Sequence, residues 1–270
     1  MIARTVAFGL CLLASPALLA ETLKVTDLDI DRLSVLGGVE VQVTQGDEVE
    51  LLVRGDSDDL AKQPFYTKGS TLVLGDSKQY RDESFSSVKY MLTVPKLSEI
   101  TLSGNGDIFV RPMEVEEMVM GVQGSGDIKV FALTAEEARV SIAGSGDIKL
   151  AELNATLLDL IVSGSGDIAI GELTTDVLEA TISGSGDINV EEAAKAASSV
   201  EVNVIGGGEV NLTPLASASA EVNIIGSGDV WLGELDYLEM NILGSGDIYH
   251  AGDPEVDGNV LGSGELNRQR

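Results

Sequence analysis

The motif Gly-Ser-Gly-Asp-Ile stands at residues 124–128, 144–148, 164–168 and 184–188, so four copies follow one another at intervals of twenty residues. In the looser form Gly-x-Gly-Asp/Glu, the motif occurs nine times at intervals of 18 to 22 residues. Such a period indicates a repeat protein in which one structural unit is stacked on the next. The first glycines of the nine tetrads are Gly104, Gly124, Gly144, Gly164, Gly184, Gly206, Gly226, Gly244 and Gly262.

Aliphatic residues hold fixed places around each tetrad. They stand two and four residues before the first glycine and four and six residues after it, as do Leu160, Val162, Ile168 and Ile170 around Gly164. This period of two predicts short strands with one face inward. A coil of about twenty residues leaves no room for a crossover helix, so equivalent strands must stack directly on one another. The sequence therefore predicts an all-β fold, a right-handed parallel β-helix with Gly-Ser-Gly-Asp corners.

Three regions are expected along the chain. Residues 1–20 combine Arg4, a short apolar run and a small-residue cleavage site, which is typical of a signal peptide. Residues 21–100 alternate without the tetrad and predict an N-terminal antiparallel β-segment, continuous with the solenoid and shielding its edge, with a hairpin at 45–47. Residues 101–270 form the β-helix. Its last coil carries His250, Asp253 and Gly258 where other coils are aliphatic, so we expect a C-terminal cap.

The composition limits the partners. The chain has 17 Lys and Arg against 44 Asp and Glu, a net charge of −27, and its single cysteine, Cys11, falls within the predicted signal peptide. So acidic a chain disfavours nucleic acid and anionic membranes. Without a thiol in the exported part, disulfides and cysteine-based sites are excluded. No segment after residue 20 is long and apolar enough for a membrane helix, so no membrane insertion is expected.

Several further motifs resemble one known family. They are Gly-Val-Glu-Val-Gln-Val-Thr-Gln-Gly-Asp at 38–47, Gly-Ser-Thr-Leu-Val-Leu at 69–74, and Val-Pro-Lys-Leu-Ser-Glu-Ile-Thr-Leu-Ser-Gly-Asn-Gly-Asp-Ile at 94–108. With the repeated tetrad, they make most of the chain similar to the auto-transporter adhesin head GIN domain family. The resemblance implies an exported β-helical domain of the bacterial envelope without catalytic activity. Asn105, Gly207, Glu209 and Glu265 depart from the tetrad, which weakens any role that needs an aspartate in every coil.

The carboxylates of the tetrads predict a column of like charges. Asp127, Asp147, Asp167 and Asp187 are its most regular members. At strand spacing, adjacent charges repel by about 1 kcal/mol even in water, so something must compensate. We favour hydrogen bonds from backbone N–H groups at the glycine-rich corners. The alternative is a Ca²⁺-binding repeat, although one carboxylate per coil supplies few of the six to eight oxygens that Ca²⁺ takes.

The last four coils carry a second pattern. By parity, two outward columns combine asparagines with an apolar stripe, which favours an interaction surface. The alternative is that these apolar residues fold back inward or are covered by the N-terminal segment. A further outward column brings two aromatic rings together, either as a sugar-stacking platform or as a cross-strand contact. The residues concerned are Asn203, Asn223, Asn241 and Asn259, then Ile205, Ile225, Leu243 and Leu261, then Trp231 and Tyr249.

Catalysis finds little support in the sequence. Lys129 and Lys149 stand near Asp127 and Asp147, as in β-helices that cleave polysaccharides, but His250 is the only visible base that works near neutral pH. We therefore expect no catalytic residues and no cofactor. The predicted function is a non-catalytic adhesin-like or scaffolding role in the periplasm or at the cell surface. Its partner would be an envelope protein, a glycan, or a second copy bound through the C-terminal half.

Overall fold

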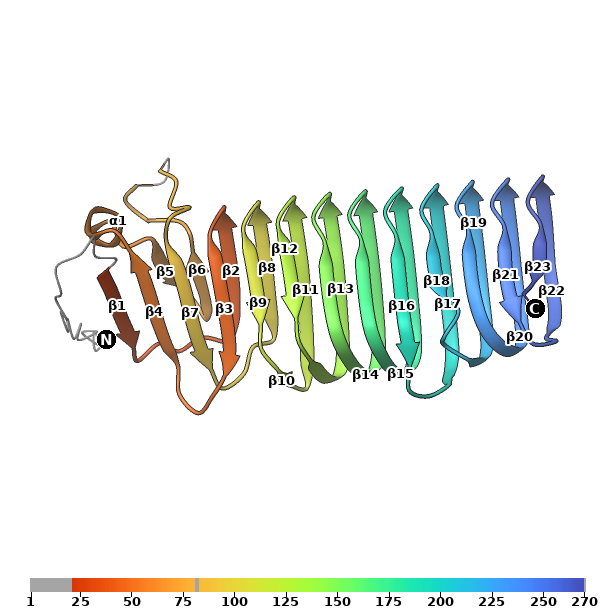
Figure 1. Ribbon diagram of the computed structural model, residues 1–270, viewed down its shortest axis with the longest axis horizontal. Helices are drawn as coiled ribbons and strands as arrows, with labels where there is room; N and C mark the ends of the chain where they lie inside the picture. Colours follow the sequence, from red (N-terminus) through yellow and green to blue (C-terminus); the bar gives the residue numbers. More distant parts are fainter. Residues whose placement is uncertain (1–20, 81–82, 270) are drawn as a thin grey trace.

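A computed structural model describes residues 21–80 and 83–269, so the predicted signal peptide lies outside the described residues. The described chain is a long stack of strands with one short helix at its N-terminal end (Figure 1). The N-terminal elements are β1 (Glu21–Thr26), β2 (Arg32–Gly37), β3 (Glu40–Gln45), β4 (Glu50–Gly55), α1 (Ser57–Ala61), β5 (Phe65–Lys68), β6 (Thr71–Leu74) and β7 (Lys89–Val94).

The remaining strands build the regular coils. They are β8 (Glu99–Gly104), β9 (Asp107–Val110), β10 (Met113–Glu114), β11 (Glu117–Gly124), β12 (Asp127–Val130), β13 (Leu133–Gly144), β14 (Ile148–Gly164), β15 (Ile168–Gly184), β16 (Ile188–Ala193), β17 (Ala197–Gly206), β18 (Val210–Leu212), β19 (Ser217–Gly226), β20 (Val230–Gly244), β21 (Ile248–Ala251), β22 (Glu255–Gly262) and β23 (Leu266–Arg268).

Each coil pairs in parallel with the coil one repeat away, as the period predicts. Ile168 of β15 pairs with Ile148 of β14 on one side and with Ile188 of β16 on the other. All three side chains are fully buried, and the same holds for most members of the aliphatic columns. The columns therefore fill the bore of the solenoid and form one continuous core. The predicted all-β solenoid is confirmed.

The tetrad glycines are required because successive coils approach each other closely at the corner. A Cβ atom on Gly166 would lie 2.0 Å from the carbonyl oxygen of Gly146 in the preceding coil. The first glycine of the tetrad has a second constraint, since Gly164 has φ of 132°, which L side chains rarely adopt. The corner thus excludes a side chain at both positions, while Ser165 between them points away and is exposed.

The first coil of the stack comes from residues 32–45, not from the first tetrad. β2 pairs in parallel with β8, and β3 pairs in parallel with β9, so that Gly37 lies beside Gly104. On its other side this coil pairs in parallel with β6 and β7, which come later in the sequence. β6 and β7 therefore lie outside a coil that precedes them in the chain, and the N-terminal segment is interleaved (Figure 1).

Antiparallel strands are confined to the outermost N-terminal layer. β4 pairs antiparallel with β1 and with β7, and β5 pairs antiparallel with β6. The N-terminal segment is thus mixed, because β2 and β3 pair only in parallel. The predicted hairpin at residues 45–47 was wrong, since β7 lies between β3 and β4. Alternation revealed the strands, but it carries no information on which neighbour each one takes.

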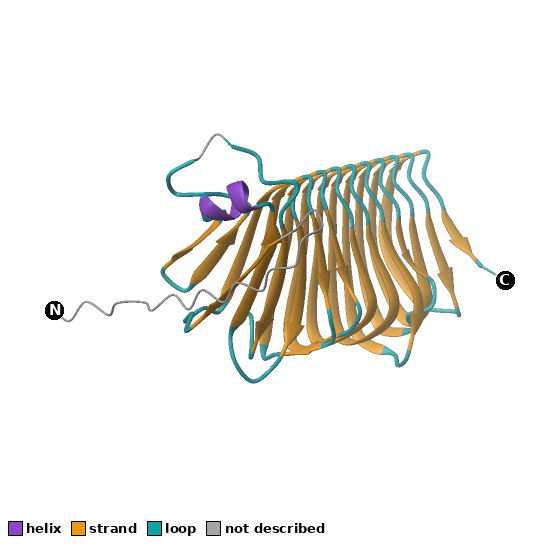
Figure 2. Cartoon of the chain, turned by 60° about the vertical axis from the view of Figure 1, so that its left-hand side comes forward, coloured by secondary structure: helices purple, strands orange, loops and turns teal. Residues whose placement is uncertain are grey.

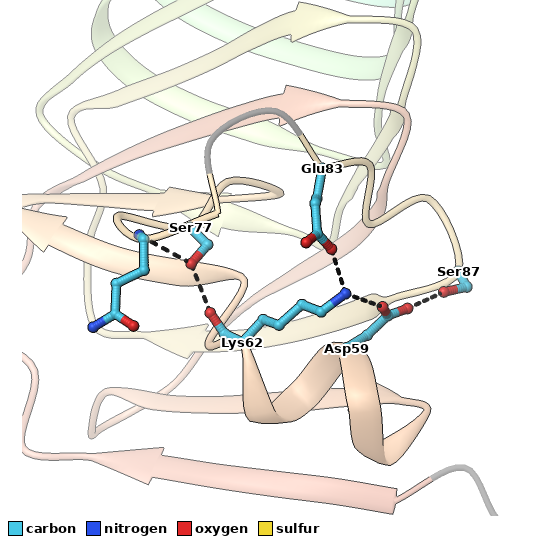
Figure 3. A network of polar contacts seen from close by, with 6 residues as sticks. Asp59, Lys62, Ser77, Glu83 and Ser87 are labelled. Atoms are coloured by element: carbon cyan, nitrogen blue, oxygen red, sulfur yellow. Dashed lines mark hydrogen bonds and ion pairs between the residues drawn. The ribbon is translucent and has the colours of Figure 1, made fainter.

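The helix and the loop after β6 close over the same end (Figures 1 and 2). Lys62, just after α1, forms ion pairs with Glu83 of the loop and, at 4.0 Å, with Asp59 of the helix (Figure 3). The Ser87 hydroxyl donates to Asp59 at 2.8 Å, and the Ser77 hydroxyl donates to the Lys62 carbonyl at 2.6 Å. These contacts fasten α1 and the loop to one another. The helix itself was not predicted.

The C-terminal end has no such cover in the described chain. Every residue of β22 is exposed, although Val256 and Val260 occupy the inward columns under Leu238 and Ile242. His250, in contrast, is buried because β23 pairs alongside it. The last coil as a cap therefore stays a prediction. Among the described residues no helix is both long and apolar enough for a membrane crossing.

Candidate binding face

The last four coils carry an exposed apolar stripe on one outer face. Its members are adjacent in register, one each on β17, β19, β20 and β22. The exposed fractions are 52% for Ile205, 50% for Ile225, 50% for Leu243 and 71% for Leu261. These side chains neither fold back into the bore nor lie under the N-terminal segment, so the prediction that they point outward is confirmed. A continuous exposed apolar surface is a common mark of an interaction site.

A ladder of asparagines runs beside the stripe. Asn223 donates from its carboxamide to the Asn203 carboxamide oxygen at 3.2 Å, and Asn241 donates in the same way to Asn223 at 3.1 Å. Asn259 continues the column in register with Asn241. Such a ladder holds its side chains in one rotamer and keeps this part of the face rigid, since each amide is fixed by the coil before it.

An acidic column borders the ladder on its other side, and the sequence analysis did not single it out. Its members lie five residues before each tetrad: Glu201, Glu221, Glu239 and Asp257 pair in register. The asparagines also donate to two of these carboxylates, Asn203 to Glu201 at 3.0 Å and Asn223 to Glu221 at 3.2 Å. The face thus presents acid, amide and apolar columns side by side. The acidic residues stand at a fixed offset of five residues before each tetrad, and this offset could have revealed the acidic column in the sequence.

The column of tetrad carboxylates is held by backbone amides. The Oδ1 atom of Asp147 accepts from the Asp167 N–H at 3.2 Å, and that of Asp167 accepts from the Asp187 N–H at 2.9 Å. In the same way, the Oδ1 atom of Asp127 accepts from the Asp147 N–H at 3.2 Å, and that of Asp187 accepts from the Glu209 N–H at 2.9 Å. Each carboxylate therefore ties its coil to the next, which offsets the repulsion between like charges. No group of three or more metal-type side chains forms a metal site within the described residues.

The pKa of Glu209 is raised in the folded protein. Burial raises its pKa, and the flanking carboxylates of Asp187 and Asp229 raise it further. Its extra methylene group also alters the geometry that the aspartates share. The charged form of Glu209 is therefore less favourable in the folded protein than in a free chain.

Trp231 and Tyr249 lie in neighbouring coils, and their rings stack. The ring centroids are 5.0 Å apart and the planes meet at 9°. The two rings therefore cover each other's faces, whereas a sugar platform would present a face to solvent. The Tyr249 hydroxyl donates to Asp247 at 3.3 Å. This geometry favours the cross-strand contact over the sugar-stacking alternative.

The residues considered for catalysis are engaged in simple pairs. Lys129 pairs with Asp127 at 3.6 Å, and Lys149 pairs with Asp147 at 3.2 Å. His250 is buried, and its Nδ1 lies 3.2 Å from the Ala251 carbonyl oxygen. The histidine pairs in register with Arg268 near the C-terminal end, several coils from the two lysines. The structure does not bring a base, an acid and a cleft together at these residues.

The comparisons with known proteins agree with this architecture. A profile of the family described as "Putative auto-transporter adhesin, head GIN domain" matches residues 29–200 and again residues 192–254. The chain belongs to this family. The resemblance inferred from the motifs at 38–47, 69–74 and 94–108 is thereby confirmed. No curated protein matches the chain.

Solved structures share the head GIN fold over nearly their whole length. A "putative lipid binding protein" from Parabacteroides distasonis ATCC 8503 has a TM-score of 0.68 and 23% identity, covering 93% of this chain and 96% of its own. A "putative adhesin" from Parabacteroides merdae ATCC 43184 has a TM-score of 0.67 and 21% identity, covering 92% and 95%. Another "putative adhesin" from P. distasonis ATCC 8503 has a TM-score of 0.62 and 21% identity, covering 92% and 96%. At these identities the similarity establishes the fold.

Proposed function

We propose that this head GIN protein is a non-catalytic binding protein of the bacterial cell envelope that holds its partner on the face of the last four coils. The observation that carries the proposal is the apolar stripe of Ile205, Ile225, Leu243 and Leu261, each at least half exposed at one register position. Its place beside the asparagine ladder gives the face both apolar area and fixed hydrogen-bonding groups. Fixed groups lose little entropy on binding.

The chemistry of the face also suggests the charge of its partner. The acidic column next to the ladder and a net charge of −27 attract cationic surfaces and repel anionic ones. We therefore infer a partner that combines basic and apolar groups, such as a protein of the envelope. Binding should weaken as salt is raised, because exposed charges are screened. Export to the periplasm or the cell surface belongs to the same proposal and is supported by the family.

The test uses a variant that the chain itself suggests. Earlier coils carry Ser163 and Ser183 at the stripe position, so Ile205→Ser, Ile225→Ser and Leu243→Ser together should preserve the coils. We expect the immobilised protein to capture a partner from envelope extract and the triple variant to lose that capture. The matched control is Leu157→Ser with Val177→Ser, which removes exposed apolar residues from a different column.

Equal capture by the triple variant and the wild type would overturn the assignment of this face. Treating the extract with protease or with periodate separates a protein partner from a glycan. The calcium alternative is tested separately through Asp167, as described in the Discussion.

A further inference from the structure

The C-terminal end of the solenoid is an open sheet edge. β22 pairs with β20 on one side, and in the described chain no strand lies on its other side (Figures 1 and 2). Its inward side chains Val256 and Val260 are 41% and 42% exposed, whereas Leu238 and Ile242 beneath them are buried. An edge of this kind offers a row of free backbone N–H and C=O groups next to apolar area, which favours pairing with another strand.

The two ends of the molecule differ, and this difference limits how copies could join. The N-terminal end finishes in β1 and β5, which pair antiparallel with β4 and β6 and have no further strand beside them in the described chain, and α1 and the loop fastened through Lys62 lie next to them. Head-to-tail stacking would place the eight residues of β22 against β5, which has only four residues and runs antiparallel to β6. An open end can instead meet an identical open end around a two-fold axis, which gives a closed dimer in place of a filament.

The sequence of β22 is self-complementary in one antiparallel register. With Gly258 on the two-fold axis, Val256 lies opposite Val260 of the second copy, so inward residues meet inward residues. In the same register Asp257 lies opposite Asn259 of the second copy, and Glu255 lies opposite Leu261 of the second copy. No two acidic residues face each other directly, although the strand carries two. Like charges directly opposite would have opposed the pairing.

The glycine at the axis supports this arrangement. Gly258 stands where the preceding coil has Met240, and a Cβ atom on it would lie 2.4 Å from the Met240 Cγ. Met240 therefore fills the bore beneath Gly258 and is buried. Met240 thus supplies apolar surface at the centre of the edge, and Gly258 adds no side chain that would project toward the second copy.

We propose that two copies of this chain join end to end through antiparallel pairing of β22, which extends the aliphatic core across the junction. This proposal does not depend on the binding face or its ligand. The contact is small for a protein interface, so we expect a weak dimer with a dissociation constant in the micromolar range. Because each chain carries a net charge of −27, the dimer should become stronger as salt rises. This is opposite to the behaviour expected of a cationic partner.

The first experiment is sedimentation equilibrium of the full exported chain over a range of concentrations and salt. We expect a monomer–dimer equilibrium in the wild type. Val260→Lys places a charge in the inward column and should raise the dissociation constant at least tenfold. Asp257→Asn changes the net charge by the same amount on the outward side, so it should leave the dimer intact or strengthen it.

The second experiment tests the register. In a chain carrying both Asp257→Cys and Asn259→Cys, the cysteine at 257 of each copy lies opposite the cysteine at 259 of the other copy. The spacing of such opposed pairs suits a disulfide. We expect a covalent dimer under mild oxidation, and much less from either single variant. Four outcomes would overturn the proposal. They are a monomeric wild type at all concentrations, a dimer that persists in Val260→Lys, a dimer abolished by the serine variant of the apolar stripe, and failure of the double-cysteine chain to cross-link.

Discussion

Replacing Gly166 with alanine should be among the most damaging small changes in the molecule. The added Cβ atom would lie 2.0 Å from the Gly146 carbonyl oxygen and 3.0 Å from the Ile142 Cγ2. Relief to an ordinary contact requires the two coils to separate by more than about 1 Å from a strand spacing of about 4.8 Å. The backbone at 166 has no positive φ to add to this cost, so the effect comes from stacking alone.

The magnitude follows from what such a separation breaks. The Ser165 N–H to Gly144 carbonyl bond at 2.9 Å and the Asp167 N–H to Asp147 bond at 3.2 Å flank the site, and both would lengthen beyond useful range. Two lost hydrogen bonds cost about 1–3 kcal/mol together, and forcing a methyl group into a packed site costs about 1–3 kcal/mol more. We expect a loss of about 2–6 kcal/mol in the free energy of unfolding.

The assay is guanidinium unfolding followed by far-UV circular dichroism, with two matched variants. Gly69 has φ of 63°, and nothing lies within 4 Å of the Cβ atom that Gly69→Ala would add. This variant therefore measures the cost of placing a side chain at positive φ alone, about 1–2 kcal/mol. Ser165→Ala has neither constraint and should change stability by less than about 0.5 kcal/mol. If Gly166→Ala costs no more than Gly69→Ala, close stacking is not the reason for the second glycine of the tetrad.

The remaining predictions concern the bore and the carboxylate column. Ile168→Asp buries an unpaired charge at a fully buried position and should cost several kcal/mol, so an unfolding midpoint close to wild type would contradict the packing described. Asp167→Asn keeps the Oδ1 acceptor for the Asp187 N–H and removes one repelling charge, so thermal stability should be unchanged or slightly higher; a loss seen in calcium but not in chelator would instead favour the calcium alternative. The pKa of Glu209 is raised on folding, so its charge destabilises the protein above that pKa and ceases to do so below the ordinary glutamate value. Glu209→Gln should therefore raise the denaturation midpoint near neutral pH and lose this advantage in acid, and an equal gain at both pH values would refute the electrostatic cause.

The regular coils could be predicted because glycines and aliphatic residues recur at fixed positions every 18 to 22 residues, and direct stacking of short strands accounts for this pattern. The period determined which residues pair, so the contact of Ile168 with Ile148 and Ile188 followed directly from the alignment on the tetrad. The outward stripe at Ile205 and Ile225 followed from parity. These inferences need only strand periodicity and stacking, which are local rules.

The interleaved first coil could not be reached by the same rules, although a signal was present. Gly37 has Leu33 and Val35 before it and Val41 and Val43 after it, at the offsets seen around the tetrad glycines of the coils before the last. Glu40 stands at the carboxylate position of the tetrad, but Val39 replaces its second glycine, and this replacement concealed the match. The placement of β6 and β7 outside the coil had no sequence signal, because alternation is the same whichever strand lies next door. The exposure of Val260 was likewise hidden, since alternation does not show which strand lies beside β22.

The interleaving has a consequence for how the chain acquires its structure. A coil beyond residue 104 finds its partner one repeat away, so these coils can nucleate anywhere and grow in both directions. The strand at 40–45 instead needs residues 89–94 on one side and residues 107–110 on the other. The pairing of β3 with β9 and that of β2 with β8 have the largest sequence separations among the described strand pairs, and closing such loops is slow. When the chain emerges amino end first, β2 and β3 must therefore wait for more than sixty later residues before both of their neighbours exist, and the N-terminal end is completed late, on a stack that is already growing.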